Sequence, residues 1–168
     1  MAPHDDPITM HAATAGPTET RALAAALAAL VRDGDLIVLT GDLGAGKTCF
    51  TQGLGAGLGV EDRITSPTFT LASVYEGRLR LNHLDVYRLD GAADALDLDL
   101  PELAEHGVTV VEWGEQIDPA LGSDRLAIAI RFGAGDDDRL IEMRLEGPAW
   151  AERAPAVQAA VSSWAATC

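Results

Sequence analysis

The segment from Gly41 to Thr48 constrains this chain more than any other feature. It reads Gly-Asp-Leu-Gly-Ala-Gly-Lys-Thr and fits the pattern G-x-x-x-x-G-K-[S/T], with the apolar run 36–39 before it and a predicted helix from Lys47 to about Leu58 after it. Glycines without a Cβ let successive backbone N–H groups converge on an anion, and a helix N-terminus adds partial positive charge. A buried strand, this loop and a helix together predict a phosphate-binding P-loop. We therefore expect a Mg-dependent nucleotide-binding protein, with ATP as the nucleotide.

The loop residues and the residue that follows them are all candidates for nucleotide contact: Gly41, Asp42, Leu43, Gly44, Ala45, Gly46, Lys47, Thr48 and Cys49. Lys47 is the only lysine of the chain. We expect it to reach the β- and γ-phosphates and to assist catalysis, and we expect the Thr48 hydroxyl to bind Mg²⁺. Cys49 allows two interpretations, an oxidation-sensitive thiol or a small buried one.

Two carboxylates close predicted apolar strands and are candidates for the same site. Mg²⁺ needs further oxygen ligands, so Asp85, Glu112 or both are expected to face the loop. Glu112 is also expected to orient or deprotonate the attacking water, which makes it a candidate catalytic residue with Lys47. Asp85 is then the outer metal ligand. His83 shares a strand face with Asp85, and both a packed histidine and a functional one remain open.

Two further residues near these strands are candidates for nucleotide contact. Thr68 lies in a Ser-Pro-Thr segment. This segment is either a switch-like loop that closes over the γ-phosphate or an ordinary proline turn. Trp113 follows Glu112 and is either a core residue or an aromatic side chain at the rim of the site.

The rest of the pattern predicts one α/β domain. The chain has 168 residues and 48% apolar content, enough for one core. Residues 1–16 are expected to form a flexible tail, 17–168 a single P-loop domain, and about 148–167 a C-terminal helix. Alternating apolar and polar residues predict hairpins around 76–77 and 133–138. The expected fold is a P-loop NTPase-like three-layer sandwich with a mixed, mainly parallel central sheet and antiparallel hairpins.

Composition limits the partners and the compartment. A formal net charge of -14 opposes a direct grip on nucleic acid phosphates, although it also serves solubility. The chain has no apolar run long enough to span a bilayer and no basic leader with an apolar core. Its two cysteines form no CxxC pair, which fits a reducing compartment. We expect a cytoplasmic protein.

Four motifs in one order resemble the bacterial TsaE family, also called YjeE, over roughly residues 17–147. The motifs are Gly-Asp-Leu-Gly-Ala-Gly-Lys-Thr (41–48), Ser-Pro-Thr-Phe (66–69), His-Leu-Asp-Val-Tyr-Arg-Leu (83–89) and Glu-Trp-Gly-Glu (112–115). The resemblance implies an ATPase needed to form threonylcarbamoyladenosine at position 37 of tRNAs that read codons beginning with A. It also implies the partner proteins TsaB and TsaD, with tRNA contacted only indirectly.

The same resemblance implies roles for individual residues. It places phosphate and Mg²⁺ at Lys47 and Thr48, the switch-like loop at Thr68, the metal-associated acid at Asp85, and a catalytic acid and aromatic pair at Glu112 and Trp113. Cys49 departs from the family, which often has a second threonine there. Because Cys49 follows the main Mg²⁺ ligand, we expect little effect on binding.

Three other classes of protein remain as alternatives. A small-molecule kinase also uses a P-loop and Mg²⁺, but the arginines that would form its lid are scattered here. A GTP-binding switch usually reads guanine with Asn-Lys-x-Asp, which a chain whose only lysine is Lys47 does not contain. A pure interaction protein with an inactive nucleotide site would bind without turnover.

Overall fold

A seven-stranded mixed sheet forms the centre of the molecule, with strand order β1-β7-β6-β2-β5-β4-β3. The computed structural model describes residues 6–67, 72–87 and 99–167. The strands are β1 (Ile8–Thr14), β2 (Leu36–Thr40), β3 (Ala72–Tyr75), β4 (Leu81–Asp85), β5 (Val108–Glu112), β6 (Arg125–Phe132) and β7 (Arg139–Glu146). The four central strands β6, β2, β5 and β4 run parallel. The other three strands pair antiparallel: β3 with β4, β7 with β6, and β1 with β7. The predicted mixed sheet with two antiparallel hairpins is confirmed.

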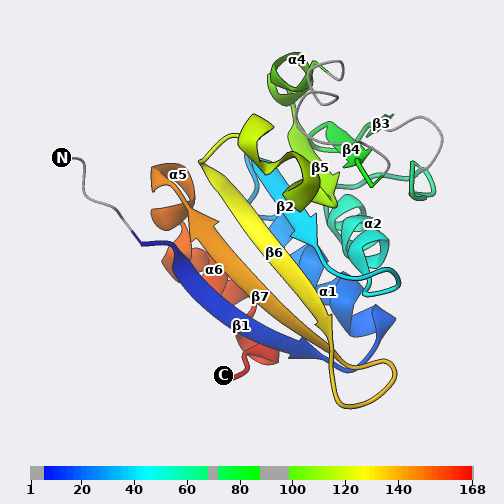
Figure 1. The fold of residues 1–168 in the computed structure, drawn as a ribbon, viewed down its shortest axis with the longest axis vertical. Coiled ribbons are helices and arrows are strands. Elements are labelled where there is room, and N and C mark those ends of the chain that lie inside the picture. The colour runs from blue at the N-terminus through cyan, green and yellow to red at the C-terminus, as the bar shows by residue number, and fades with distance from the viewer. Residues whose placement is uncertain (1–5, 68–71, 88–98, 168) are drawn as a thin grey trace.

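Helices cover the sheet unevenly. They are α1 (Pro17–Ala28), α2 (Lys47–Gly57), α4 (Leu100–Ala104), α5 (Pro148–Ala151) and α6 (Ala154–Ala160), with the 3₁₀ segments η2 (Gly114–Ala120) and η3 (Ser162–Trp164). Figure 1 shows α1 and α6 behind the sheet, and α4 near the end of the sheet that holds β3, β4 and β5. None of the helices in the described ranges is long and apolar enough to cross a membrane.

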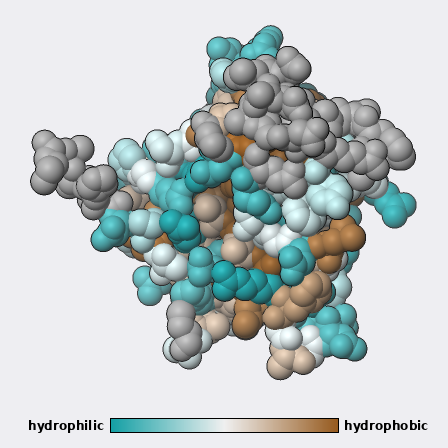
Figure 2. Space-filling view, viewed as in Figure 1, coloured by the Kyte–Doolittle hydropathy of each residue, from teal (hydrophilic) through white to brown (hydrophobic). Residues whose placement is uncertain are grey.

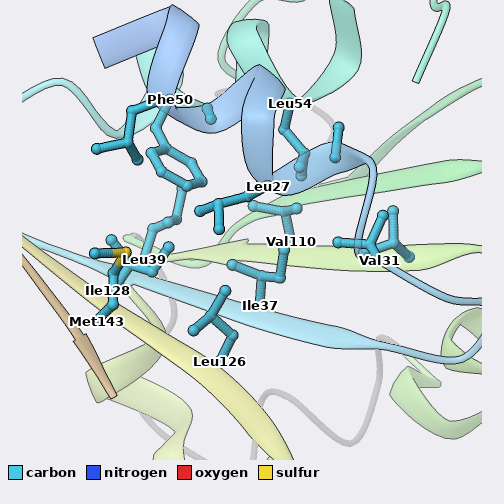
Figure 3. Close-up of a cluster of buried hydrophobic side chains, with 14 of the residues drawn as sticks. Leu27, Val31, Ile37, Leu39, Phe50, Leu54, Val110, Leu126, Ile128 and Met143 are labelled. Carbon is cyan, nitrogen blue, oxygen red and sulfur yellow. The ribbon is translucent and has the colours of Figure 1, made fainter. Parts of the chain in front are cut away.

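Two hydrophobic clusters, one on each face of the sheet, account for the layers. The larger one lies between the sheet and α1 and α2, where Leu27, Phe50 and Leu54 meet Ile37 and other strand residues (Figure 3). The smaller one consists of the buried residues Leu84, Val86, Val111 and Ile117. Side chains from α4 and η2 pack against it. Alternate residues of the buried strands therefore serve opposite faces, which confirms the predicted α/β fold class.

The sheet face toward the viewer of Figure 1 is polar over β6 and β7. Arg125, Arg131, Glu142 and Arg144 line a hollow of about 480 Å³ there. Figure 2 shows hydrophilic side chains around a smaller apolar area in this view. An antiparallel pair can expose one face to water when its side chains alternate in this way, and these strands do.

The prediction of a flexible tail over residues 1–16 is wrong for residues 8–14. These residues form β1, which pairs antiparallel with β7 from Ile8 opposite Leu145 to Thr14 opposite Arg139. Met10 and Ala12 turn toward the core, while the outward residues are polar or small, so the period of two is weak in the sequence. The strand exists because β7 offers it a partner, and this pairing is not encoded locally.

The prediction of one C-terminal helix over about 148–167 is also wrong. The segment breaks into α5, α6 and η3, and α6 ends at Ala160. Pro155 has no N–H to continue the hydrogen bonds of α5, so the chain turns at Arg153 and starts again. The apolar residues nevertheless reach the core, because Trp150, Val157 and Val161 are all buried.

Candidate functional site

The P-loop connects the end of β2 to the start of α2, at the C-terminal ends of the parallel strands. Gly46 is the N-cap of α2, and its φ of 113° is one that residues with a side chain rarely adopt. A Cβ on Gly41 would meet the carbonyl oxygen of Ile130 at 2.5 Å. The first backbone N–H groups of α2 have no partners within the helix. The loop is thus shaped as an anion cradle at a helix N-terminus.

Lys47 folds back over this loop. Its Nζ donates hydrogen bonds to the carbonyl oxygens of Gly41 at 2.6 Å and Asp42 at 2.9 Å, and it lies 3.8 Å from the centroid of the Trp113 ring. Burial lowers the pKa of the Lys47 ammonium, and nearby carboxylates, above all Glu112, act in the opposite direction. The ammonium is held at the cradle by neutral carbonyls and a ring face, which phosphate oxygens can replace.

Glu112 joins the loop to the sheet. Thr48 Oγ1 donates to Glu112 Oε1 at 2.9 Å. The other carboxylate oxygen, Oε2, is 3.3 Å from His83 Nε2, although the two atoms do not form a hydrogen bond. Glu112 and His83 are both buried, at 1% and 0% exposure. A carboxylate so withdrawn from water is held in one orientation, with Oε1 directed at the start of α2.

Asp85 lies beside Glu112, because the parallel pairing of β4 and β5 sets the two residues opposite each other. Its Oδ2 accepts a hydrogen bond from Ser66 Oγ at 2.8 Å, and its Oδ1 accepts one from the backbone N–H of Tyr87 at 3.0 Å. Both carboxylate oxygens are therefore oriented by neighbours before any ligand arrives. The exposed fraction of Asp85 is 8%, so the acid is at the margin of the interior.

Trp113 lies at the rim of the site and is only half-buried. Its φ is 62°, which is uncommon for a bulky residue, and its N–H is tied to the carbonyl of Leu39 at 3.0 Å. The ring covers Lys47 and meets the Tyr87 ring at a centroid distance of 4.8 Å. The left-handed backbone turns the Trp113 side chain away from the strand direction of β5 and toward the loop.

The oxygen atoms of this site suit a hard divalent cation. The hydroxyl of Thr48 touches one carboxylate, and the register of β4 and β5 brings the second alongside. No group of three or more His, Cys, Asp and Glu side chains able to hold a metal by themselves occurs within the described ranges. Mg²⁺ binds in just such incomplete sites, because it keeps several waters and takes further oxygens from the phosphates of its substrate.

A sequence model of the family described as Threonylcarbamoyl adenosine biosynthesis protein TsaE matches residues 14–141. The chain belongs to the TsaE family. This family acts in tRNA threonylcarbamoyladenosine biosynthesis.

Individual TsaE proteins support this membership over most of the chain. The tRNA threonylcarbamoyladenosine biosynthesis protein TsaE of Bacillus subtilis is 44% identical over 135 residues, covering 80% of this chain and 84% of that protein. The protein of the same name from Streptomyces coelicolor is 48% identical over 120 residues, covering 69% and 81%. The crystal structure of Bacillus subtilis YdiB matches with a TM-score of 0.77 and 38% identity, covering 91% of this chain and 96% of that one.

The structure of this TsaE-family chain brings most of the predicted site residues together. Lys47, Thr48, Glu112 and Trp113 meet at the P-loop, and Asp85 lies on the strand next to Glu112. The side chain of Leu43 is 80% exposed, and Ala45 is fully buried beneath the loop. These two residues offer a nucleotide only their backbone or an exposed apolar contact.

Two predicted contact residues stand apart from this group. The Cys49 thiol is directed to the start of α1, where Sγ is 3.5 Å from the carbonyl oxygen of Pro17. Cys49 is half-buried, so the structure does not decide between the buried thiol and the oxidation-sensitive one. Thr68 lies outside the described residues, so its switch-like role stays a prediction.

Three residues that sequence reasoning did not assign also belong to the site. Ser66 orients Asp85, and its place in the Ser-Pro-Thr-Phe motif was the available signal. The Tyr87 ring contacts the Trp113 ring at a tilted angle. Arg139 binds carbonyl groups of the P-loop from the far end of a hairpin, and no pattern in the sequence indicates this contact.

Proposed function

We propose that this chain is a cytoplasmic subunit that binds and hydrolyses Mg-ATP for the threonylcarbamoyl modification of adenosine 37 in tRNA. It acts with TsaB and TsaD and meets tRNA only through them. Membership of the TsaE family and the names of its relatives support the pathway. The net charge of -14 supports docking on partner proteins over a direct grip on RNA.

One contact carries the proposal of hydrolysis, the hydrogen bond from Thr48 to Glu112 at 2.9 Å. It joins the first turn of α2, which borders the phosphate cradle, to the carboxylate that ends β5. A nucleotide whose phosphates occupied the cradle would therefore present its terminal phosphate near a buried, oriented acid. A carboxylate at this position can serve both as a Mg²⁺ ligand and as the base that hydrolysis requires.

The residues divide the work as follows. The loop and the α2 N-terminus bind the phosphates, and Lys47 exchanges the carbonyls of Gly41 and Asp42 for phosphate oxygens. Bound Mg²⁺ would neutralise phosphate charge, and Thr48, Asp85 and Glu112 are the residues suited to hold it. Glu112 orients the attacking water and accepts its proton, while the buried His83 keeps its Oε2 side closed to solvent.

Two substitutions separate binding from hydrolysis. Lys47→Ala removes a charge-assisted interaction with phosphate, which contributes about 1.5–3 kcal/mol, so nucleotide affinity should fall roughly 10- to 100-fold. Glu112→Gln keeps the size of the side chain but removes the base, so hydrolysis should fall about 100-fold or more while binding persists. Calorimetric titration with Mg-ATP gives the affinity. Steady-state phosphate release, alone and with TsaB, TsaD and tRNA, gives the rate.

Glu61→Gln is the matched control, since Glu61 is exposed, follows the end of α2 that is opposite to the P-loop, and has no hydrogen bond or ion pair among the described residues. Phosphate release that depends on the partners and disappears only in Glu112→Gln supports the whole proposal. Unchanged release in Glu112→Gln would remove the acid from the mechanism. Transfer of phosphate to a metabolite would point to a kinase, and stronger competition by GTP than by ATP would point to a GTP-dependent switch.

A further inference from the structure

The guanidinium of Arg139 binds backbone carbonyl groups of the P-loop. Arg139 is the first residue of β7, directly after the 133–138 turn that joins β6 to β7. Its Nε donates to the carbonyl oxygen of Ala45 at 2.8 Å, and one terminal nitrogen lies 3.4 Å from the carbonyl oxygen of Gly44. The other terminal nitrogen donates to the carbonyls of Asp136 and Asp138, each at 2.8 Å. One guanidinium thus connects two loops about 90 residues apart in sequence.

An aromatic contact holds the guanidinium in place. Arg139 Cζ lies 4.7 Å from the centroid of the Phe132 ring. Phe132 is the cross-strand partner of Arg139 in the β6–β7 ladder, so the two side chains share one face. Because it is held by this ring face and by carbonyl groups of both loops, the Arg139 guanidinium has little freedom to leave the P-loop.

These contacts act on the peptide planes that form the cradle. The carbonyl of Ala45 and the N–H of Gly46 belong to one planar trans peptide group, so they point in opposite directions. Fixing the carbonyl on the outer side therefore fixes the Gly46 N–H on the inner side, where an anion would bind. The next peptide group back is held too, since the Ala45 N–H donates to the Asp42 carbonyl at 3.0 Å while Arg139 approaches the Gly44 carbonyl.

The loop needs such support because glycines flank these peptide groups. Gly44 and Gly46 have φ angles of 80° and 113°, and glycine populates many other φ angles at little cost. An unsupported loop would sample conformations in which the Gly46 N–H points elsewhere, and nucleotide binding would have to restore the order.

We propose that Arg139 is a positioning residue that pre-orders the Gly44–Gly46 backbone for phosphate binding. The inference rests on the proposed function, which assigns the cradle to nucleotide phosphates. Arg139 touches the outer carbonyls and acts on the phosphates through them.

The test compares Arg139→Met and Arg139→Lys with the wild type. Methionine keeps an apolar stem for Phe132 but has no donor, and lysine keeps the charge without the fork. Arg131→Met is the control, because Arg131 is exposed on the opposite face of the same hairpin and has no hydrogen bond or ion pair among the described residues. The ligands are inorganic pyrophosphate and ADP, each with Mg²⁺. Affinity is measured by calorimetry below the unfolding temperature of every variant.

Arg139→Met should weaken pyrophosphate and ADP about tenfold, the loss expected from two hydrogen bonds of ordinary strength. Arg139→Lys should recover only part of this affinity, and Arg131→Met should bind like the wild type. In hydrolysis assays KM should rise while kcat stays near the wild-type value, since ground state and transition state use the same cradle. The ratio of wild-type to Arg139→Met affinity should be the same at low and high salt, because a local clamp is not screened.

Three outcomes would overturn the positioning role. The first is equal pyrophosphate binding by the wild type and Arg139→Met, and the second is full recovery of affinity in Arg139→Lys. The third is a ratio of wild-type to Arg139→Met affinity that falls to one at high salt. The last two would reduce Arg139 to a nearby positive charge. If the wild type itself binds neither pyrophosphate nor ADP, the assignment of the cradle in the proposed function fails first, and the two failures are thereby distinguished.

Discussion

At the scale of single residues, the site is built by withdrawing two carboxylates from water and orienting them with hydrogen bonds. Glu112 is directed by Thr48 on one oxygen and faces His83 on the other, and Asp85 is held by Ser66 and a backbone N–H. Charges arranged in this way need little reorganisation when a ligand arrives, which is the property that a catalytic site requires.

Cys49 gives a residue-scale prediction that depends on pH. Burial raises the pKa of its thiol, with Arg21 and Arg139 acting in the opposite direction. A raised pKa leaves less thiolate at a given pH, and only the thiolate is alkylated. In a Cys168→Ser background, the pH–rate profile of iodoacetamide labelling should therefore have its midpoint above that of the same protein unfolded in urea. A midpoint at or below the unfolded value would support the oxidation-sensitive interpretation of Cys49.

At the scale of elements, α2 shows why a poor helix former can be the right residue. Gly53, Gly55 and Gly57 lower its intrinsic helix propensity, and the same glycines let it approach its neighbours. A Cβ on Gly53 would overlap the backbone of Arg21 in α1, and one on Gly57 would meet Ala28 Cβ at 2.5 Å. The close approach packs α2, whose first residues border the cradle, directly against α1.

Gly53→Ala tests this packing. Alanine favours an isolated helix by about 1 kcal/mol over glycine, but overpacking a core costs typically about 1–3 kcal/mol. The second effect should win because the obstacle is backbone of α1, which cannot rotate away like a side-chain end. We expect a net loss of at least about 1 kcal/mol in urea unfolding. Gly122→Ala is the control, since its Cβ would meet nothing within 4 Å. A stabilised Gly53→Ala protein would show that the helices can separate at little cost.

Sequence reasoning succeeded for elements whose signal is local and failed where a partner decides. The P-loop has fixed chemistry at fixed spacing, and the hairpin strands alternate clearly, so both could be placed. The strand β1 has weak alternation and depends on β7 for its hydrogen bonds. Pro155 stands in the sequence, but the apolar periodicity around it, taken alone, predicts one continuous helix. Arg139 could not be found, because its role exists only once the hairpin turn meets the loop.

At the scale of the whole molecule, the two ends of the chain complete the sheet together. The family model matches residues 14–141, so β1 lies almost entirely before this range and α5 and α6 lie after it. The N–H of Ala166 donates to the carbonyl of His11 at 2.9 Å, which ties the C-terminal segment to β1. Trp150, Val157 and Val161 enter the same core as α1. The segments outside the family model are therefore part of the fold that supports the site.

Arg153 is predicted to hold this C-terminal segment in place. It is 4% exposed, forms a two-pronged ion pair with Asp35 at 2.6 and 2.9 Å, and donates to the Leu30 carbonyl at 3.0 Å. Its guanidinium also covers the Trp150 ring at 3.8 Å. Removing one partner of a buried pair leaves the other charge without compensation, so Arg153→Met should cost about 3–5 kcal/mol in urea unfolding.

Arg32→Met is the matched control, because Arg32 and Glu152 link the same two segments through an exposed pair, with side chains 58% and 59% accessible. Exposed pairs contribute about 0–1 kcal/mol, so this variant should unfold almost like the wild type. Adding Asp35→Asn to Arg153→Met should return part of the loss, since it removes the uncompensated carboxylate. If Arg153→Met costs no more than Arg32→Met, the C-terminal segment is held by Trp150 and its apolar neighbours, and the buried ion pair only sets its register.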